Sequence, residues 1–513
     1  MKKLTLFIAA ALCIAAFQPA QAQGVLGSLK NKVTGAAQNE VRKAAQKGVE
    51  NAKQNARDKA EAEKWASKAG PGKTLYVSVS TGSARADGLT PQTPMKDLQK
   101  AVNTAEDNDV IYVAEGNYLG NLDRGYIEIG KFGDSSHELG KFISLYGGWS
   151  TDFSERDVIK HVTKFQPSDH TFIAPLFNFN ARRPYGYKGP LGDVVVDGFV
   201  FDFGENNRYC VANVDDERTG TPNKGVLTGR ILCDDESPAV PKEGYMSGDE
   251  YALHMDVEGN VRVSNCIFVN CRDYGLNALM GKGHMEVCNN IFISCKYAAC
   301  QIKGNVRDDD IDKVSLDFHH NTVLFTWTRN KTYEDMGQGF RFMNGIRTID
   351  VHNNIFGCNS NCAVERVYYE SNKQMEALKE SNLYDNYFFA NRRDLELASM
   401  GKATISVFAS QIEEVDESLI GPKFEGNMEL PSGNDAFINA IDKSYLQGYM
   451  SLEVSKTQSY NANSAANQIN RLFGMNQQGS EIVRPNMFGN KYPWQKAKDL
   501  FGKVPGYGAQ MPE

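Results

Sequence analysis

The sequence predicts an all-β solenoid of stacked strands through the middle of the chain, and two observations support this prediction. The first is a six-residue phrase that occurs five times: Val263-Ser-Asn-Cys-Ile-Phe268, Val287-Cys-Asn-Asn-Ile-Phe292, Phe318-His-His-Asn-Thr-Val323, Val351-His-Asn-Asn-Ile-Phe356 and Leu383-Tyr-Asp-Asn-Tyr-Phe388. The starting positions 263, 287, 318, 351 and 383 are 24, 31, 33 and 32 residues apart. Such a period is typical of a chain that stacks one unit on the next. Within each copy the apolar positions follow strand-turn-strand patterning.

The second observation is an asparagine at the fourth position of the phrase. It is Asn290, Asn321, Asn354 and Asn386 in successive copies, and Cys266 in the first. A polar amide beside buried apolar positions needs hydrogen-bond partners, and identical amides stacked at about 4.8 Å can bond to one another. The column therefore predicts an asparagine ladder. Asparagine also suits turns without any ladder, but the flanking apolar positions keep the same register.

Segments before the repeats extend the pattern. They are Lys73-Thr-Leu-Tyr-Val-Ser-Val-Ser-Thr-Gly82, Asp87-Gly-Leu-Thr-Pro-Gln-Thr-Pro-Met-Lys-Asp-Leu-Gln-Lys-Ala-Val102, Asp109-Val-Ile-Tyr-Val-Ala-Glu-Gly-Asn-Tyr118, Ile143-Ser-Leu-Tyr-Gly-Gly-Trp149 and Val194-Val-Val-Asp-Gly-Phe-Val-Phe201. With these segments the chain resembles the right-handed parallel β-helix proteins, also called pectate-lyase-like, over about residues 73 to 390. The resemblance implies a first strand, an N-terminal capping helix and successive rungs. It says little of function, because this architecture hosts lyases, hydrolases, adhesins and passive surface proteins.

Composition divides the chain into four regions. Residues 1–22 have the features of a signal peptide, with two lysines, an apolar run and a small-residue cleavage site. They predict export to the periplasm, the cell surface or the extracellular space. Residues 23–70 form an Ala- and Lys-rich helical stalk or linker, residues 73–390 the β-helix with a long insert at 202–249, and residues 391–513 an irregular and helical region that caps or wraps the last rung. No stretch after the signal peptide is long and apolar enough to span a bilayer.

The net charge and the cysteine content bear on the binding partners and the disulfide bonds that the sequence predicts. The net charge of -7 gives no reason to expect a nucleic-acid partner. Nine cysteines follow Cys13, an odd number, so the sequence leaves their pairing open. The pairs it suggests are Cys271 with Cys295, Cys358 with Cys362, and Cys210 with Cys233. A stack of apolar thiols is the alternative for the first pair.

Stacked rungs bring residues one period apart into contact, so candidate sites are sought in columns. Two places before the ladder stand Cys288, His319 and His352, in a column expected to face outward. Thiolate and imidazole groups bind metals, and histidine is a common base. Three side chains in one straight line do not surround an ion, however, and the sequence shows no fourth ligand. Solvated side chains are the alternative, and the role of this column stays open.

A second column combines basic and aromatic side chains. Arg272 and Lys296 hold equivalent positions, Trp327 follows them, and Tyr274 and Tyr297 stand nearby. Like charges in adjacent rungs repel one another unless water or an anion lies between them. The column therefore suggests binding of an acidic sugar, whose carboxylate would meet the cations and whose ring would pack on the aromatics. A solvated strand edge is the alternative.

An acidic run precedes the third copy of the phrase. Its carboxylates belong to Asp308, Asp309, Asp310 and Asp312. Clustered carboxylates can hold calcium, although Asp-rich turns are also common without an ion. Calcium is therefore possible, and no other cofactor is expected.

Taken together, the residues favour an exported β-helix protein that presents a long face for binding a glycan or a cell-surface protein without catalysis. The alternative is a polysaccharide lyase that acts on uronate-containing glycan by β-elimination, which needs a base and a cation beside the carboxylate. A polygalacturonase-type hydrolase is disfavoured, because the Asp motifs, Gly-His-Gly and Arg-Ile-Lys of those enzymes do not occur in the sequence.

Overall fold

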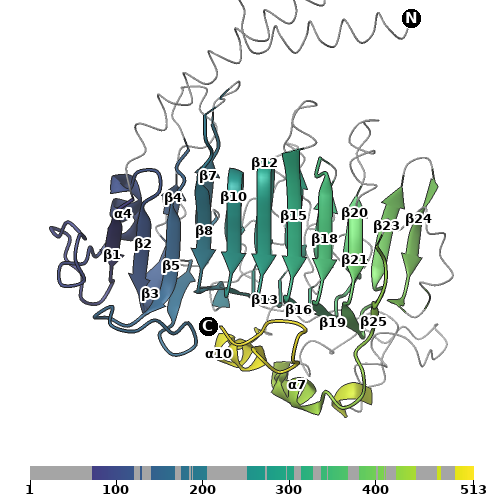
Figure 1. Cartoon of the computed structure of the whole chain (residues 1–513). Coiled ribbons are helices and arrows are strands. Elements are labelled where there is room, and N and C mark those ends of the chain that lie inside the picture. Colours follow the sequence, from purple (N-terminus) through teal and green to yellow (C-terminus); the bar gives the residue numbers. More distant parts are fainter. Residues whose placement is uncertain are drawn as a thin grey trace, which may run out of the picture. The chain divides into compact units, whose positions relative to one another are not determined.

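Figure 1 shows the computed structural model of the chain. It describes residues 72–120, 127–129, 140–167, 175–183, 187, 189–204, 251–271, 274–295, 297–304, 313–326, 337–343, 345–367, 381–399, 402–409, 411, 423–445, 471–474 and 491–512. The predicted signal peptide and stalk, and nearly all of the 202–249 insert, lie outside these residues. Two compact units divide the chain, residues 1–70 with 184–191 and residues 71–183 with 192–513. The fold described below is that of the second unit.

The second unit is a parallel β-helix whose coils build three faces. The first face contains β4 (Ile127–Ile129), β7 (Phe177–Ala181), the N-terminal halves of β10 (Leu253–Ser264) and β12 (Leu276–Cys288), β14 (Ala298–Gly304), β17 (Gln338–Met343), β20 (Cys362–Val367) and β23 (Leu395–Ser399). The second face contains β1 (Thr74–Val77), β2 (Val110–Ala114), β5 (Ser144–Trp149), β8 (Asp193–Asp197), the C-terminal halves of β10 and β12, β15 (Val314–His319), β18 (Thr348–His352) and β21 (Ser381–Tyr384).

The third face is a separate sheet. It contains β3 (Gly116–Leu119), β6 (Thr163–Gln166), β9 (Phe199–Asp202), β11 (Ile267–Val269), β13 (Ile291–Ile293), β16 (Thr322–Leu324), β19 (Ile355–Gly357), β22 (Tyr387–Phe389) and β25 (Met428–Glu429). Neighbouring strands within each face pair in parallel, and Figure 1 shows them side by side along the coil. Among the named strands of the described residues, β24 (Lys402–Val407) alone pairs antiparallel, with β23. The coil thus continues past residue 390, as far as β25.

A left-handed residue turns the chain from the second face to the third. Asn265, Asn289, His320, Asn353 and Asp385 have φ between 50° and 58°, a conformation that asparagine and aspartate tolerate better than most residues. The bend from the first face to the second is at Gly259 and Gly283 in β10 and β12. A Cβ atom on Gly283 would lie 2.1 Å from the carbonyl oxygen of Gly259, so only glycine fits this approach.

The asparagine ladder follows the left-handed residue and lies inside the coil. The side-chain oxygen of Asn321 accepts hydrogen bonds from the backbone N–H and side-chain amide of Asn290, both at 3.0 Å. Asn354 accepts from Asn321 in the same way, at 2.9 and 3.2 Å, and Asn386 accepts from Asn354. Asn427 continues the ladder one coil further. The side chains of Asn290, Asn321, Asn354 and Asn386 are fully buried. Each amide therefore supplies its neighbour with a hydrogen-bond partner that water cannot supply there.

A second ladder lies at the turn between the third and first faces. Asn391 accepts hydrogen bonds from the backbone and side chain of Asn359, and Asn359 accepts from Thr326. Each of these residues follows a left-handed one, as Cys271 and Cys295 do in earlier coils. All four cysteines of the suggested pairs Cys271–Cys295 and Cys358–Cys362 are buried thiols. The suggested bridges are therefore wrong, and Cys210 and Cys233 lie outside the described residues.

The C-terminal region packs along the outer side of the third face. Figure 1 shows α7 (Asp435–Ala440) and α10 (Trp494–Ala497) beside the strands of this sheet. Outward apolar residues of the sheet form one buried cluster with Phe437, Tyr492 and Phe501. The backbone of Tyr492 also forms two hydrogen bonds with the side chain of Asn270: its N–H donates at 2.8 Å and its carbonyl oxygen accepts at 2.9 Å. The third face is therefore covered and offers little surface to a ligand.

Helix α4 (Leu98–Thr104) begins at Asp97, whose side chain accepts from the backbone N–H of Gln99, and buries Leu98, Ala101 and Val102. Within the described ranges, none of the helices combines the length and apolar character needed to cross a bilayer.

Candidate binding surface on the second face

The outer side of the second face carries a continuous row with one side chain per coil. Strand register places these residues side by side in the order Tyr76, Tyr112, Tyr146, Asp197, Ser264, Cys288, His319, His352 and Tyr384, which we call the outer row. Their chain neighbours Val263, Val287, Phe318 and Val351 are fully buried in the core. Since strand side chains alternate, the outer row points away from the core. Asp197, Ser264 and Cys288 in the middle of the row are buried all the same, whereas the rings at its two ends are half-buried.

A second row runs parallel to the outer row. It consists of Arg262, Glu286, Asp317, Asp350 and Asn382, in neighbouring registers two residues before the outer row. Its three carboxylates are half-buried. The two rows together present rings, imidazoles, carboxylates and one guanidinium on a single face.

The rings at the C-terminal end of the outer row stack on one another. His319 and His352 lie with centroids 5.0 Å apart and planes 4° from parallel, and His352 and Tyr384 lie 4.8 Å apart at 9°. The ammonium of Lys423 sits 3.3 Å from the centroid of Tyr384. These ring faces therefore pack against each other, and the polar ring edges carry the hydrogen-bonding groups.

Both nitrogens of each stacked imidazole already have a protein partner. His319 contacts Glu286 through Nε2 at 3.1 Å and His320 through Nδ1 at 2.8 Å. His352 forms an ion pair with Asp317 through Nε2 at 3.0 Å and contacts Asn353 through Nδ1 at 2.7 Å. A general base needs a nitrogen within reach of the substrate proton, so either ring could act as a base only after one of these contacts opens.

The same contacts set the protonation of the cluster. Partial burial lowers the pKa of His352, but the bonds to Asp317 and Asn353 outweigh it and leave the pKa above its ordinary value. Burial, together with the neighbouring His319 and His352, lowers the pKa of His320 to about 4. His320 is therefore neutral at pH 7, beside a more readily protonated His352.

The N-terminal end of the outer row is aromatic. Tyr112 stacks on Trp149 at 4.3 Å and 28°, and Tyr76 meets Tyr112 edge-on at 5.8 Å. The guanidinium of Arg156 lies 5.4 Å from the ring of Tyr146 and forms an ion pair with Asp197. The three tyrosines are half-buried, so part of each ring remains open to solvent.

The predicted basic and aromatic column is described only in part. Arg272, Lys296 and Trp327 lie outside the described residues, as do Asp308, Asp309, Asp310 and Asp312 of the acidic run. Tyr274 and Tyr297 are described. Their rings lie 5.6 Å apart at the start of the first face, and both side chains are buried.

Sequence reasoning missed a hydrogen-bonded row beside these tyrosines. On the first face Asn277 contacts Nδ1 of His254 at 3.1 Å and accepts from Gln301 at 3.0 Å. Gln301 in turn accepts from Arg341 at 2.9 Å, and Arg341 donates to Glu365 at 2.6 Å. His254, Asn277 and Gln301 are buried, and the row connects the coils of the first face.

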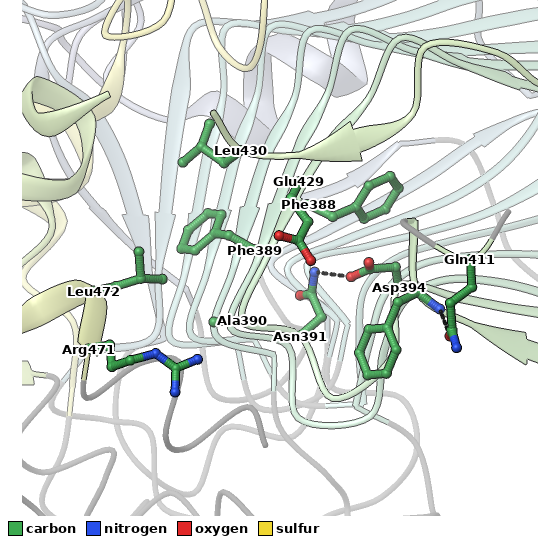
Figure 2. A pocket seen from close by; sticks show the side chains of 11 residues that line it. Phe388, Phe389, Ala390, Asn391, Asp394, Gln411, Glu429, Leu430, Arg471 and Leu472 are labelled. Atoms are coloured by element: carbon green, nitrogen blue, oxygen red, sulfur yellow. Dashed lines mark hydrogen bonds between the residues drawn. The ribbon is translucent and has the colours of Figure 1, made fainter. Parts of the chain in front are cut away.

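Figure 2 shows a cavity of about 610 Å³ near the C-terminal end of the coil. Phe388, Phe389, Leu430 and the carboxyl group of Asp394 help to line it. Burial raises the pKa of Asp394 to about 6. Its two oxygens accept from the side chain of Asn391 at 3.0 Å and the backbone of Ala409 at 2.8 Å. Asp394 thus ties the chain after β24 to the second ladder, which is a structural role.

Comparisons with known proteins leave the family open. No protein-family model matches the chain, and no curated protein matches it. Among solved structures, pectate lyase Pel9A matches with a TM-score of 0.29 at 12% identity, over 82% of this chain and 91% of that one. A rhamnogalacturonan lyase matches with a TM-score of 0.19 at 11% identity, over 85% of this chain and all of that one. Scores this low carry no argument, so the β-helix assignment depends on the strand pairings alone.

Proposed function

We propose that the protein is an exported β-helix that binds a neutral, hydroxyl-rich glycan along the second face without catalysis. The observation that carries this proposal is the outer row, which places half-buried tyrosines at its N-terminal end and two half-buried histidines and a tyrosine at its C-terminal end. Strand spacing of about 4.8 Å repeats these groups along the coil axis, and a linear polymer can contact many of them at once. The third face is covered by the C-terminal region, so the second face is the better surface for a long ligand.

The chemistry of the surface suits sugar hydroxyls. The carboxylates of Glu286, Asp317 and Asp350 are hydrogen-bond acceptors, and the exposed parts of Tyr112 and Tyr146 offer apolar ring surface. The same carboxylates repel a uronate, because like charges at an interface oppose binding. A neutral glycan is therefore favoured at this surface. Binding of acidic glycan through Arg272, Lys296 and Trp327 remains a separate prediction from the sequence.

The absence of catalysis is supported by the partners of the candidate groups. A lyase needs a base that can take the proton beside the uronate carboxyl group. His319 and His352 have both ring nitrogens engaged, and Asp197 is held by Arg156, Ser264 and Asn265. These are the imidazole and carboxylate side chains of the outer row. Their occupied positions favour binding over elimination.

A polysaccharide panel tests the proposal. The full chain, kept in EDTA, is run in affinity electrophoresis against neutral and uronate-containing polysaccharides. We expect retardation by at least one neutral polymer, and we expect Tyr146→Ala and the double change Asp350→Asn with His352→Ala each to reduce it severalfold. Glu396→Gln is the matched control, because Glu396 is half-buried on the outer side of the first face and pairs with Arg393 at 3.3 Å. Thermal melting checks that each variant is folded.

Two results would contradict the proposal. One is equal retardation of the parent and both second-face variants, since the ligand would then lie elsewhere. The other is an increase in ultraviolet absorbance when the protein is incubated with a uronate polymer. That increase reports an unsaturated product and would establish the lyase alternative.

A further inference from the structure

We propose that Glu286, Cys288 and His319 form a binding site for a thiophilic divalent cation such as Zn²⁺. Glu286 and Cys288 lie two residues apart on β12 and point to the same side, and His319 lies opposite Cys288 on β15. The thiol sulfur, a carboxylate oxygen and a ring nitrogen all lie within 4.8 Å of one another. Within the described residues this is the one such group of three His, Cys, Asp or Glu side chains. The proposal does not depend on glycan binding.

From the sequence, the objection to a metal site was that three side chains in one straight line do not surround an ion. The structure provides a different set of three. Cys288, His319 and His352 follow one straight line across three strands, and such a line cannot surround an ion. Glu286 instead lies beside Cys288 along the same strand, so Glu286, Cys288 and His319 form a triangle over two strands. His352 belongs to the next coil, where Asp317 holds its Nε2 at 3.0 Å.

The three ligand types select the class of cation. Zinc is bound by cysteine sulfur at about 2.3 Å, by histidine nitrogen at about 2.0–2.1 Å and by carboxylate oxygen at about 2.0–2.2 Å. Around a tetrahedral ion these atoms stand roughly 3.3–3.6 Å apart. His319 Nε2 and Glu286 Oε1 are already 3.1 Å apart, and a side-chain rotation can bring the sulfur closer. Calcium and magnesium prefer oxygen ligands throughout, so a thiol argues against them.

Neighbouring groups already orient the histidine ligand. His319 stacks on His352, and its Nδ1 lies 2.8 Å from Nδ1 of His320. A metal on Nε2 requires the ring proton on Nδ1, where His320 can accept it. Such outer partners fix the ring and tautomer of metal-bound histidines. Binding of the cation displaces the thiol proton, which goes to solvent.

The cationic side chain of Arg262 lies beside two members of the triangle. The guanidinium of Arg262 lies 3.7 Å from the sulfur of Cys288, and its Nε lies 3.3 Å from Glu286. Cys288 itself is only 2% exposed, whereas the side chain of Arg262 is 54% exposed and has room to move away. Arg262 is therefore a competitor for the same position. Its removal should strengthen metal binding, which a plain ion-pair network would not predict.

The test is a cobalt titration of the full chain after removal of metals with EDTA and exchange into chelator-free buffer. Co²⁺ serves as the probe, because a cobalt–thiolate bond gives a near-ultraviolet charge-transfer band, and Zn²⁺ should abolish that band by displacing the cobalt. We expect Cys288→Ser to abolish the band. We expect His319→Gln and Glu286→Gln to weaken cobalt binding at least tenfold, and Arg262→Gln to tighten it severalfold.

The matched control is His284→Gln. His284 lies on the same strand and the same outer side, but it is exposed and bonds to Ser315 at 2.8 Å. We expect its replacement to leave cobalt binding unchanged, and circular dichroism verifies that every variant is folded. The proposal is overturned if the parent shows no charge-transfer band, if Cys288→Ser retains it, or if Arg262→Gln weakens binding. Because the glycan assay is run in EDTA, failure of one proposal leaves the other standing.

Discussion

Replacing Asn321 by leucine tests whether the ladder holds the coils together. Asn321 is fully buried, its oxygen accepts two hydrogen bonds from Asn290, and its amide donates to Val287 O at 2.8 Å. Leucine has a similar size but no polar atoms. The change leaves the backbone N–H of Asn290 without this acceptor and Val287 O without this donor, whereas the side chain of Asn290 keeps its bond to Val263 O.

The expected cost follows from those two groups. A buried polar group that loses its partner costs about 1–3 kcal/mol, so the loss in unfolding free energy should be about 2–6 kcal/mol, partly offset by the added apolar surface. Urea unfolding followed by circular dichroism measures it. The slope of the transition must be compared as well, because a solenoid can lose cooperativity when one coil is weakened.

Asn382→Leu is the control for this experiment. Asn382 is half-buried on the outer side of the second face and donates one hydrogen bond to Asp350 at 2.9 Å. Surface changes of this kind usually stay within about 0.5 kcal/mol. Equal unfolding midpoints for the Asn321 and Asn382 variants would show that the buried amides are not needed, and the ladder argument would be wrong.

Three further predictions concern other parts of the chain. Burial raises the pKa of Asp394 to about 6, so as the pH rises from about 4 to 6 this carboxyl group ionises first in the unfolded chain, and the unfolding free energy should fall by up to about 3 kcal/mol. Urea unfolding at several pH values should show a smaller fall for Asp394→Asn than for the parent, and an equal fall would contradict the raised pKa. Tyr492→Ala should cost about 3–5 kcal/mol in the packing of the C-terminal region, because the Tyr492 ring is buried in the cluster over the third face and its hydroxyl accepts from the backbone N–H of Asp442 at 3.1 Å; faster proteolysis there would show it, and unchanged proteolysis would refute it. Removal of residues 23–70 should leave a soluble, folded core, because the sequence of that segment has too little apolar surface to belong to the core; an unfolded product would exclude the linker interpretation.

The features of the coil that the sequence made predictable are those in which one residue type repeats at one place. The Asn column is visible because Asn290, Asn321, Asn354 and Asn386 share a chemistry as well as a position. The second ladder occupies an equally regular position but contains Cys271, Cys295, Thr326, Asn359 and Asn391. Thiol, hydroxyl and amide groups fill the same turn there, so no single residue type marks the column. Only the left-handed residue before each one is common, and it too varies in type.

The strand register of the first face could not be predicted from the sequence, because the loops before its strands differ in length. Residues His254, Asn277, Gln301, Arg341 and Glu365 form one hydrogen-bonded row, yet their numbers differ by 23, 24, 40 and 24. Asn277, Gln301 and Glu365 follow the fourth position of their phrases by 11 residues, whereas Arg341 follows Asn321 by 20, because residues 327–336 come between them. A column drawn at constant distance from the ladder therefore misses the first face in that coil.

One ligand of the candidate metal site could not be found by comparing residues one coil apart. A column compares residues one coil apart, and it identified Cys288 and His319 because they occupy the same place in successive phrases. Glu286 is two residues from Cys288 along one strand, where period-two alternation puts both side chains on the same side. Combining the stacking direction with the strand direction would have found it. The triangle also depends on the ladder, because a shift of one residue would turn Cys288 and His319 into the core. If Asn290 and Asn321 fix that register, Asn321→Leu should weaken cobalt binding as well as stability, although it lies outside the ligand set.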